Sequence, residues 1–335
     1  MKNIILIFYF GIVSLFNTTL ITPFLLFPNI ISNKIFLVHI NSFLLGLVFV
    51  LKFFYKIKIM IENDSIINTF QNKKNIILSN HLSEFDYMFI YNIISMSEKF
   101  SFTKNIIRMI MTKTVYKMLP GIGMASIFLG SISINHINKN LTLDNLKKLK
   151  INNNDILIMF CEGDIQYEKT LIKSIEYAKK LEQKPTKNII FPKTTGFEII
   201  RSNNPIDEII YITLYYSDIK IPICKPIRLL TSDIPKEIYI SFDKKNIAAT
   251  NNIGQDIIDI YRSIDDKIDI LSSDTYKHKK NNFKHYDITI SEMLSFFSQM
   301  FLLGLSIYMI LMYRYFILYN ILLISLYYFY VWKYL

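Results

Sequence analysis

A histidine and an aspartate five residues apart are the best placed residues for chemistry in this 335-residue chain. His81 and Asp86 belong to the segment NHLSEFD, which follows an apolar run and precedes a helical pattern. A turn from a strand into a helix can fold back so that the carboxylate meets one imidazole nitrogen and fixes its tautomer. The other nitrogen can then accept a proton, so the spacing predicts a general base. The alternative is an aspartate that caps the helix beside an unrelated histidine.

Two other segments offer polar groups just after predicted strands. Glu162 and Gly163 lie at the end of the best candidate for a buried strand, a continuous apolar run within 155–161. Because ligands of open α/β sheets bind beyond the carboxyl ends of strands, these residues could hold a polar acceptor. A simple turn explains this segment when it is taken alone. Lys193 lies in the segment FPKTTGF, where its charge could meet a phosphate or remain in solvent.

The elements that must position these residues are short β-branched runs that alternate with helical patterns over residues 52–292. This alternation predicts an α/β domain with a mixed, partly parallel sheet and flanking helices. The predicted strands cover 75–79, 99–103, 127–134, 155–161, 188–191, 208–216 and 237–242. The predicted helices cover 86–95, 104–118, 142–150 with Thr142 as its cap, 168–183 and 254–271.

Both ends of the chain are strongly hydrophobic. Uncharged runs cover residues 3–33 and 35–51 at one end, and 293–312 and 315–332 at the other. Most of these runs approach the length that crosses the hydrocarbon core, and the shorter second run could span or re-enter. The alternatives are a cleaved signal peptide, which the length and the lack of a small-residue cleavage site disfavour, and a C-terminal hairpin buried in a soluble core.

The chain is therefore divided into three predicted parts. Residues 1–58 form N-terminal membrane helices or a re-entrant hairpin, 59–292 a cytosolic domain, and 293–335 a C-terminal transmembrane hairpin. Lysines on both flanks of the central domain predict its cytosolic side. The polar residues expected of a transport pathway are almost missing from the hydrophobic runs, which disfavours a transporter.

Composition excludes several other classes. The net charge is +11, but no nucleic-acid-binding motif and no basic stripe with interleaved aromatics accompanies it, so no nucleic acid partner is predicted. The two cysteines are too few for a disulfide scaffold or a cysteine-based zinc site, and no metal ion is predicted. The sequence makes no prediction of oligomeric state.

Taken together in their order, four segments resemble the glycerophospholipid acyltransferase family, which includes 1-acylglycerol-3-phosphate acyltransferases. The matching segments are His81–Asp86, 120–124 (PGIGM), 160–164 (FCEGD) and 192–197 (PKTTGF). Lys113 lies seven residues before Pro120, as a lysine does in the family. Lys267, Asp269 and Leu271 are similar to a motif of the branch that includes lysocardiolipin and lysophosphatidylinositol acyltransferases.

The resemblance implies a function and a site. His81 is expected to take the proton of an acceptor hydroxyl, and Asp86 to steady the imidazolium. The expected substrate-binding residues are Lys113, Gly123, Glu162, Gly163 and Lys193. The expected substrates are acyl-CoA, as co-substrate, and a lysophospholipid or lysophosphatidic acid acylated at sn-2, with no cofactor or metal. The expected location is the endoplasmic reticulum membrane.

The chain departs from the family pattern around the phosphate. Met124 replaces a tryptophan, His136 and Ile165 replace arginines, and Asp164 replaces a threonine. Losing two guanidinium groups removes bidentate phosphate recognition, and Asp164 would repel a phosphomonoester. The departures favour a phosphodiester headgroup. They also leave open an alternative, a non-catalytic lipid-binding or membrane-shaping protein on an acyltransferase scaffold.

Overall fold

The structure of the protein is a computed structural model. It describes residues 2–13, 15, 29–69, 74–95, 97, 106–112, 123, 126–127, 130–134, 139–153, 155–220, 235–273, 282–312 and 314–334.

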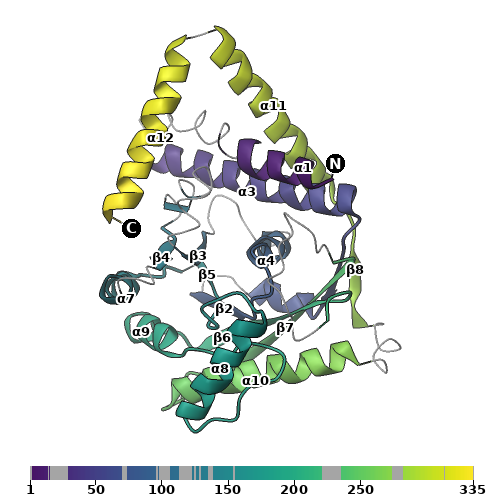
Figure 1. The fold of residues 1–335 in the computed structure, drawn as a ribbon, viewed down its shortest axis with the longest axis vertical. Helices are drawn as coiled ribbons and strands as arrows, with labels where there is room; N and C mark the ends of the chain where they lie inside the picture. The colour runs from purple at the N-terminus through teal and green to yellow at the C-terminus, as the bar shows by residue number, and fades with distance from the viewer. Residues whose placement is uncertain are drawn as a thin grey trace.

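A mixed eight-stranded sheet in the order β4-β3-β5-β2-β6-β7-β1-β8 forms the centre of the described chain (Figure 1). Its strands are β1 Lys58–Glu62, β2 Asn75–Ser79, β3 Ile107–Thr112, β4 Ile132–Ile134, β5 Ile156–Met159, β6 Glu208–Tyr216, β7 Glu237–Asn246 and β8 Lys284–Tyr286. The strands from β4 to β6 are parallel to their neighbours, whereas β7 is antiparallel to β6, and β8 is antiparallel to β1. The predicted class, a partly parallel α/β sheet with flanking helices, is confirmed.

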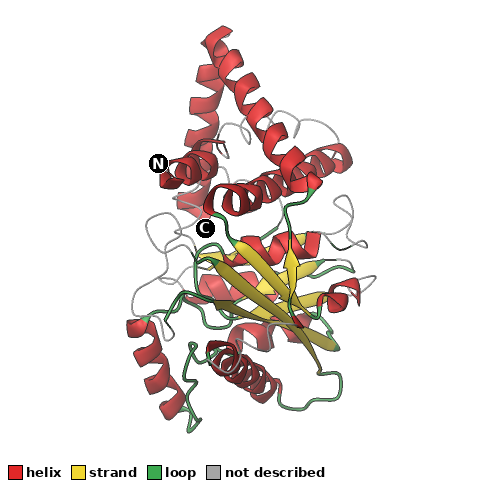
Figure 2. Cartoon of the chain, turned by 90° about the vertical axis from the view of Figure 1, so that its right-hand side faces the viewer, coloured by secondary structure: helices red, strands yellow, loops and turns green. Residues whose placement is uncertain are grey.

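Helices cover both faces of the sheet, which Figure 2 shows as red layers around the yellow strands. On one face lie α4 (Asp86–Ser95) and, across it, α3 (Asn29–Tyr55). On the other lie α7 (Lys139–Lys148), α9 (Thr195–Asn203) and α10 (Ile253–Ser272), with α8 (Glu168–Lys180) packed beside α10. Because helices cover the two faces, groups that bind a ligand are expected at the ends of the strands.

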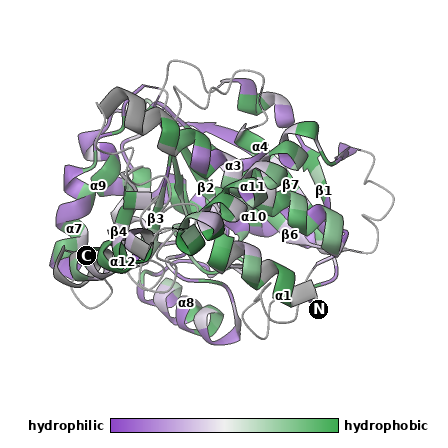
Figure 3. Cartoon of the chain, turned by 90° about the horizontal axis from the view of Figure 1, so that it is seen from above, coloured by the Kyte–Doolittle hydropathy of each residue, from purple (hydrophilic) through white to green (hydrophobic). Residues whose placement is uncertain are grey.

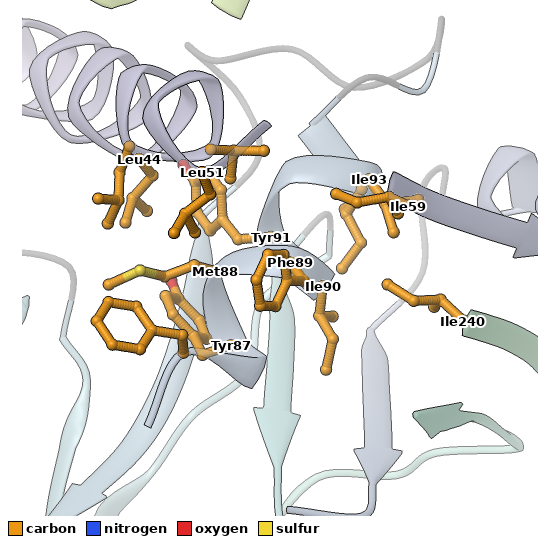
Figure 4. Close-up of a cluster of buried hydrophobic side chains, with 14 of the residues drawn as sticks. Leu44, Leu51, Ile59, Tyr87, Met88, Phe89, Ile90, Tyr91, Ile93 and Ile240 are labelled. Atoms are coloured by element: carbon orange, nitrogen blue, oxygen red, sulfur yellow. The ribbon is translucent and has the colours of Figure 1, made fainter. Parts of the chain in front are cut away.

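The central strands are apolar on both sides because each side packs against helices. In β2, Ile77 contributes to the core beneath α3 and α4, whereas Ile76 and Leu78 contribute to the core over α10. Successive side chains of a strand point to opposite faces, which explains this division. Figure 4 shows the first core, in which Leu44 and Leu51 of α3 meet Met88 and Tyr91 of α4.

The terminal helices differ in how much of their apolar surface is covered. Two described segments are long and apolar enough to cross a membrane, Leu37–Tyr55 and Ile290–Met312. The first is 78% buried inside the protein, because α3 lies between α4 and α11 (Ile290–Met312), whereas the second is only 22% buried. Figure 3 shows the hydrophobic colouring of α3 and α11 beside the more hydrophilic α7 and α8.

The exposed face of α11 is an apolar stripe. Its residues recur every three or four positions and are Ile290, Leu294, Phe297, Phe301, Leu305 and Tyr308. The adjoining helix α12 (Arg314–Tyr334) also exposes large apolar side chains, among them Leu318 and Leu322. Surface of this extent fits contact with lipid better than contact with water.

A buried ion pair joins α3 to α11. The Lys52 amine lies 2.8 Å from Glu292 Oε1, and the two side chains are 3% and 0% exposed. Asn92 of α4 donates a hydrogen bond of 3.1 Å to the same oxygen. The backbone N–H of Thr289 donates to Glu292 Oε2, so the carboxylate also caps α11. Three helices thus meet at one carboxylate.

Several predicted elements are confirmed and others are wrong. Strand 75–79 and helix 86–95 have the predicted bounds, and strand 208–216 does as well. The predicted strands 155–161 and 237–242 and helices 168–183 and 254–271 are present with shifted ends. The predicted strand 99–103 lies outside the described residues. Helix α9, strand β1 and strand β8 were not predicted.

The errors have physical reasons. The predicted helix 104–118 is wrong over Ile107–Thr112, which is β3 and pairs with β5. Within the predicted strand 127–134, Ile132–Ile134 is a strand, whereas Ile127 is helical and Gly130 forms a turn at φ +66°; residues 128–129 lie outside the described residues. Helix α7 begins at Lys139, so Thr142 lies inside it and is not its cap. The predicted strand 188–191 is a loop. The carboxylate of Asp265 holds it by accepting hydrogen bonds from the backbone N–H groups of Lys187 and Asn188.

Candidate active site

The turn between β2 and α4 brings His81 and Asp86 together. His81 Nδ1 lies 2.9 Å from Asp86 Oδ2. The Asp86 side chain is fully buried, and the His81 side chain is 20% exposed. Since Nδ1 is engaged by the carboxylate, Nε2 is the nitrogen left for a substrate proton. The geometry of a general base that the spacing predicts is therefore present.

The carboxylate of Asp86 accepts five hydrogen bonds from described residues. Oδ2 accepts from His81 and from the backbone N–H groups of Leu82 (2.5 Å) and Ser83 (2.9 Å). Oδ1 accepts from the hydroxyl of Ser83 (3.0 Å) and from that of Tyr216. Asp86 is also the first residue of α4, where the helix dipole favours a negative charge. These donors replace the water that the buried carboxylate loses on folding.

The orientation of His81 is fixed from three sides. The ring of Phe160 stacks on the imidazole, with 4.2 Å between centroids and 15° between planes. The backbone N–H of Gln166 donates to the His81 carbonyl at 2.8 Å. The preceding Asn80 side chain exchanges two hydrogen bonds, of 2.9 and 2.8 Å, with the backbone of Leu214 in β6. The imidazole is thus held by β6, by the segment after β5 and by its own turn.

Glu162 lies at the same edge of the sheet, because β5 is the parallel neighbour of β2. Its side chain is fully buried, and neither carboxylate oxygen has a hydrogen-bond partner in the described part of the chain. Burial raises the pKa of Glu162 well above its ordinary value. The backbone amide of His81 opposes this shift, while the charges of Asp86, Asp164 and Asp265 add to it.

The ends of β2 and β5 are tied together by Tyr261 of α10. Its hydroxyl accepts from the backbone N–H of Cys161 at 2.7 Å and donates to the carbonyl of Ser79 at 2.8 Å. His81 and Glu162 follow these two residues closely in the chain. The distance between the two candidate side chains is therefore set by a helix on the far side of the sheet.

Gly163 and Lys193 are also in contact. Gly163 has φ +70°, which favours glycine, and a Cβ placed there would lie 3.2 Å from the Lys193 amine. The backbone N–H of Lys193 donates to the Cys161 carbonyl at 2.8 Å, which keeps the lysine segment against the end of β5. The Lys193 side chain is exposed, so its charge is available to a ligand.

The structure describes only some of the predicted site residues. His81, Asp86, Glu162, Gly163 and Lys193 gather at one edge of the sheet. Gly123 is described as buried, but residues 113–122 and 124–125, which include Lys113 and Met124, lie outside the described residues, as does His136. No group of three or more His, Cys, Asp or Glu side chains that could hold a metal ion occurs within the described ranges.

Sequence reasoning missed three residues of the site. Ser83 lies within the predicted turn and could have been noticed there. Tyr216 and Tyr261 are 130 and 182 residues from the partners they bind, Asp86 and Ser79. No local pattern marks them, since only the register of the sheet brings β6 and α10 to this edge.

Comparisons with known proteins show which proteins the chain resembles. The family model described as Acyltransferase matches residues 58–205, a range that contains the site residues predicted from sequence but not Tyr216 or Tyr261. Lysocardiolipin acyltransferase 1 of Gallus gallus is 27% identical over 190 residues, which cover 54% of this chain and 48% of that protein. The protein of the same name from Danio rerio is 25% identical over 201 residues, 58% of this chain and 49% of that one. The chain spans about half the length of these relatives.

One solved structure shares the fold. The crystal structure of the 1-acyl-sn-glycerophosphate (LPA) acyltransferase PlsC from Thermotoga maritima aligns with a TM-score of 0.50 and 14% sequence identity. The alignment covers 80% of this chain and 98% of that chain. This likeness concerns the fold, a mixed α/β sheet with flanking helices. Residues 58–205 match the Acyltransferase family model, and the chain is similar to glycerophospholipid acyltransferases, the family that its four ordered segments resemble.

Proposed function

We propose that the chain is an acyl-CoA-dependent O-acyltransferase that acylates the sn-2 hydroxyl of a 1-acyl-glycerophospholipid. The observation that carries this proposal is the His81–Asp86 pair, with Nδ1 held at 2.9 Å from a buried carboxylate and Nε2 left for substrate. The names of the related proteins, lysocardiolipin and LPA acyltransferases, support a lysophospholipid as the acceptor.

The proposed reaction needs one proton shuttle. His81 Nε2 takes the proton of the acceptor hydroxyl while its oxygen attacks the carbonyl carbon of the acyl thioester. Asp86 stabilises the imidazolium that forms. When the tetrahedral intermediate collapses, the C–S bond breaks and the imidazolium returns the proton to the sulfur of coenzyme A. The products are the diacylated phospholipid and free coenzyme A, and His81 is regenerated.

The acceptor is proposed to lie over Glu162 and Lys193. Gly163 lets the exposed Lys193 amine approach the end of β5, where it can meet a phosphate. The acidic, exposed Asp164 next to it opposes a doubly charged phosphomonoester. A phosphodiester headgroup therefore suits this chain better than lysophosphatidic acid does.

The proposed location is the endoplasmic reticulum membrane, with the domain of residues 59–292 in the cytosol. The exposed apolar stripe of α11 supports contact with lipid. The lysines that flank the domain support the cytosolic side, because positive charge concentrates there. At a membrane surface, both acyl chains of the acceptor and donor can stay in the bilayer during transfer.

The test measures release of the coenzyme A thiol from oleoyl-CoA by membranes that contain the protein. Lysophosphatidic acid, lysophosphatidylinositol and monolysocardiolipin are offered separately. His81→Ala is expected to lower the rate roughly 10²–10⁴-fold. His285→Ala, at an exposed histidine of the edge strand β8, is the matched control and should stay within a few-fold.

The outcomes separate the candidate functions. Preference for a diester headgroup supports the proposed acceptor class, and preference for lysophosphatidic acid would contradict it. Release that does not depend on His81, or no release with any acceptor, would favour a non-catalytic lipid-binding protein on the same scaffold.

A further inference from the structure

The two oxygens of Asp86 have different partners. Oδ2 faces His81 and the backbone of the turn, whereas the described donors to Oδ1 are the hydroxyls of Ser83 and Tyr216. Tyr216 lies 130 residues away in sequence, at the end of β6. The contact with Oδ1 is therefore a tertiary one, independent of the local turn.

The register of the sheet explains how Tyr216 reaches the site. Ser79 pairs with Ile212 at the end of β2, and β6 continues beyond this point alongside the segment of the turn. Asn80 extends the pairing by its two hydrogen bonds with Leu214. Two residues further on, the Tyr216 hydroxyl arrives beside Ser83 (3.1 Å) and Asp86.

Tyr216 is suited to donate rather than accept. Its side chain is fully buried, and burial together with the charge of Asp86 raises its pKa well above the ordinary value. The phenol therefore keeps its proton at physiological pH. A hydrogen bond to a charged carboxylate is among the stronger ones in proteins.

We infer that Tyr216 is a positioning residue of the proposed transfer reaction, which holds Asp86 Oδ1 so that Oδ2 faces His81 Nδ1. This inference rests on the proposed function for its role in turnover, but the geometric part stands on the hydrogen bonds alone. A carboxylate can rotate about its Cβ–Cγ bond. Its backbone donors and Ser83 all lie on the turn itself, so Tyr216 is the one described donor that ties the carboxylate to the sheet.

The consequence concerns the tautomer of His81. When Oδ2 is held against Nδ1, the neutral imidazole carries its proton on Nδ1, and Nε2 is the base. When the carboxylate is free to turn, the tautomer with the proton on Nε2 gains population, and that form cannot accept a proton from the acceptor hydroxyl. Losing the tautomer with Nε2 as the base should lower kcat and leave the binding of acyl-CoA unchanged.

The test compares Tyr216→Phe with Tyr215→Phe. Tyr215 is the matched control, because it is the neighbouring residue of β6 and its side chain lies in the core on the opposite face. Two quantities are measured in the full-length protein in detergent micelles: kcat and KM for oleoyl-CoA, and the imidazole ¹⁵N resonances of His81, which report its tautomer.

For Tyr216→Phe we expect kcat to fall about 10- to 100-fold with KM for oleoyl-CoA within two-fold, since one charge-assisted hydrogen bond is lost. The resonances should change from one tautomer to a mixture. Tyr215→Phe should keep both the rate and the single tautomer. A Tyr216→Phe protein that keeps the single tautomer would overturn the inference, whatever its rate.

Ser83→Ala gives an independent test if Tyr216→Phe does not fold. It removes the other donor to Oδ1, and Tyr216 alone should then maintain the single tautomer. A mixture of tautomers in Ser83→Ala would overturn the inference, because it would show that Ser83 holds the orientation of the Asp86 carboxylate. If the unaltered protein shows no thiol release, the proposed function fails, but the resonances still decide whether Tyr216 positions Asp86.

Discussion

Two buried carboxyl groups flank the candidate histidine and have opposite surroundings. Asp86 follows β2 and accepts hydrogen bonds on both oxygens, including one from a tyrosine of another strand. Glu162 follows the neighbouring strand β5 and has no described hydrogen-bond partner on either oxygen. The first group has its partners within the protein, whereas the second has none among the described residues and is available to a ligand.

The difference arises from where each residue lies in its element. Asp86 begins a helix, and its carboxylate folds back over the preceding turn, where the backbone N–H groups of Leu82 and Ser83 donate to it. Glu162 lies in the turn after β5 and precedes Gly163, whose left-handed backbone turns the chain away. Burial of an unpaired carboxyl is unfavourable, so a site that keeps one is a candidate for ligand binding.

The largest expected effect comes from Asp86→Asn. The neutral amide of asparagine cannot stabilise the imidazolium, so kcat should fall roughly 10²–10⁴-fold. Its NH2 group would also face the N–H and O–H donors that now bind Asp86, with no acceptor there. The melting temperature should fall as well. The control is Asp144→Asn, at an exposed acid of α7. Full activity in Asp86→Asn would contradict the role assigned to the pair.

Glu162→Gln should affect binding more than folding. If the carboxyl meets the acceptor, KM for the lysophospholipid should rise about 10-fold, the loss expected for one buried hydrogen bond. The melting temperature should stay the same or rise, because no hydrogen bond of the free protein is lost. Kinetics with varied acceptor and thermal melts measure both. A marked drop in melting temperature with unchanged KM would contradict this prediction, because it would show that Glu162, like Asp86, has a structural role in the free protein.

The pH dependence of stability should identify Glu162. Because burial raises its pKa in the folded state, the folded protein binds a proton that the unfolded chain has already released above about pH 4.3. The contribution of Glu162 to the free energy of unfolding is therefore largest below that pH and declines as pH rises toward the folded pKa.

Thermal melts of the unaltered protein and Glu162→Gln between about pH 5 and 8 test this sign. The advantage of Glu162→Gln should grow as pH rises, and the comparison cancels the similar shift at Asp265. Glu176→Gln, at an exposed glutamate, should give no such trend. A constant difference across the range would show that Glu162 finds a partner in the folded protein.

The smallest expected effect is that of Gly163→Ala. A Cβ would force a left-handed alanine and press on the Lys193 amine, so KM for the acceptor should rise a few-fold and stability should fall by about 1 kcal/mol. Gly130→Ala is the matched control, because Gly130 has a similar φ of +66° but its Cβ would meet Arg108 only at 3.7 Å. An equal rise in KM for both variants would show that the effect of Gly163→Ala on KM does not depend on the contact with Lys193.

The local part of the site could be predicted from sequence. His81 and Asp86 are close in the chain, and the strands before His81 and Glu162 are continuous apolar runs that end beside polar residues. The partners of Asp86 and of the strand ends could not be predicted, since Tyr216 and Tyr261 arrive through sheet register and helix packing.

The fold errors have a related cause. Residues 107–112 have apolar side chains at helical spacing, but pairing with β5 decides their structure. The short strands β1 and β8 depend on each other and on β7, so neither has a clear local pattern. The loop at 188–191 has the composition of a strand and is held by a side chain of α10 instead.

The Lys52–Glu292 pair has a consequence for the order of synthesis. The two residues are 240 positions apart. At a synthesis rate of roughly 5–20 residues per second, about 12–50 s pass between the addition of Lys52 and that of Glu292. During this interval Glu292 is not yet available to Lys52, and the ion pair between α3 and α11 can form only after α11 begins to emerge. The core around α3 is therefore completed by a segment that is made 240 residues later.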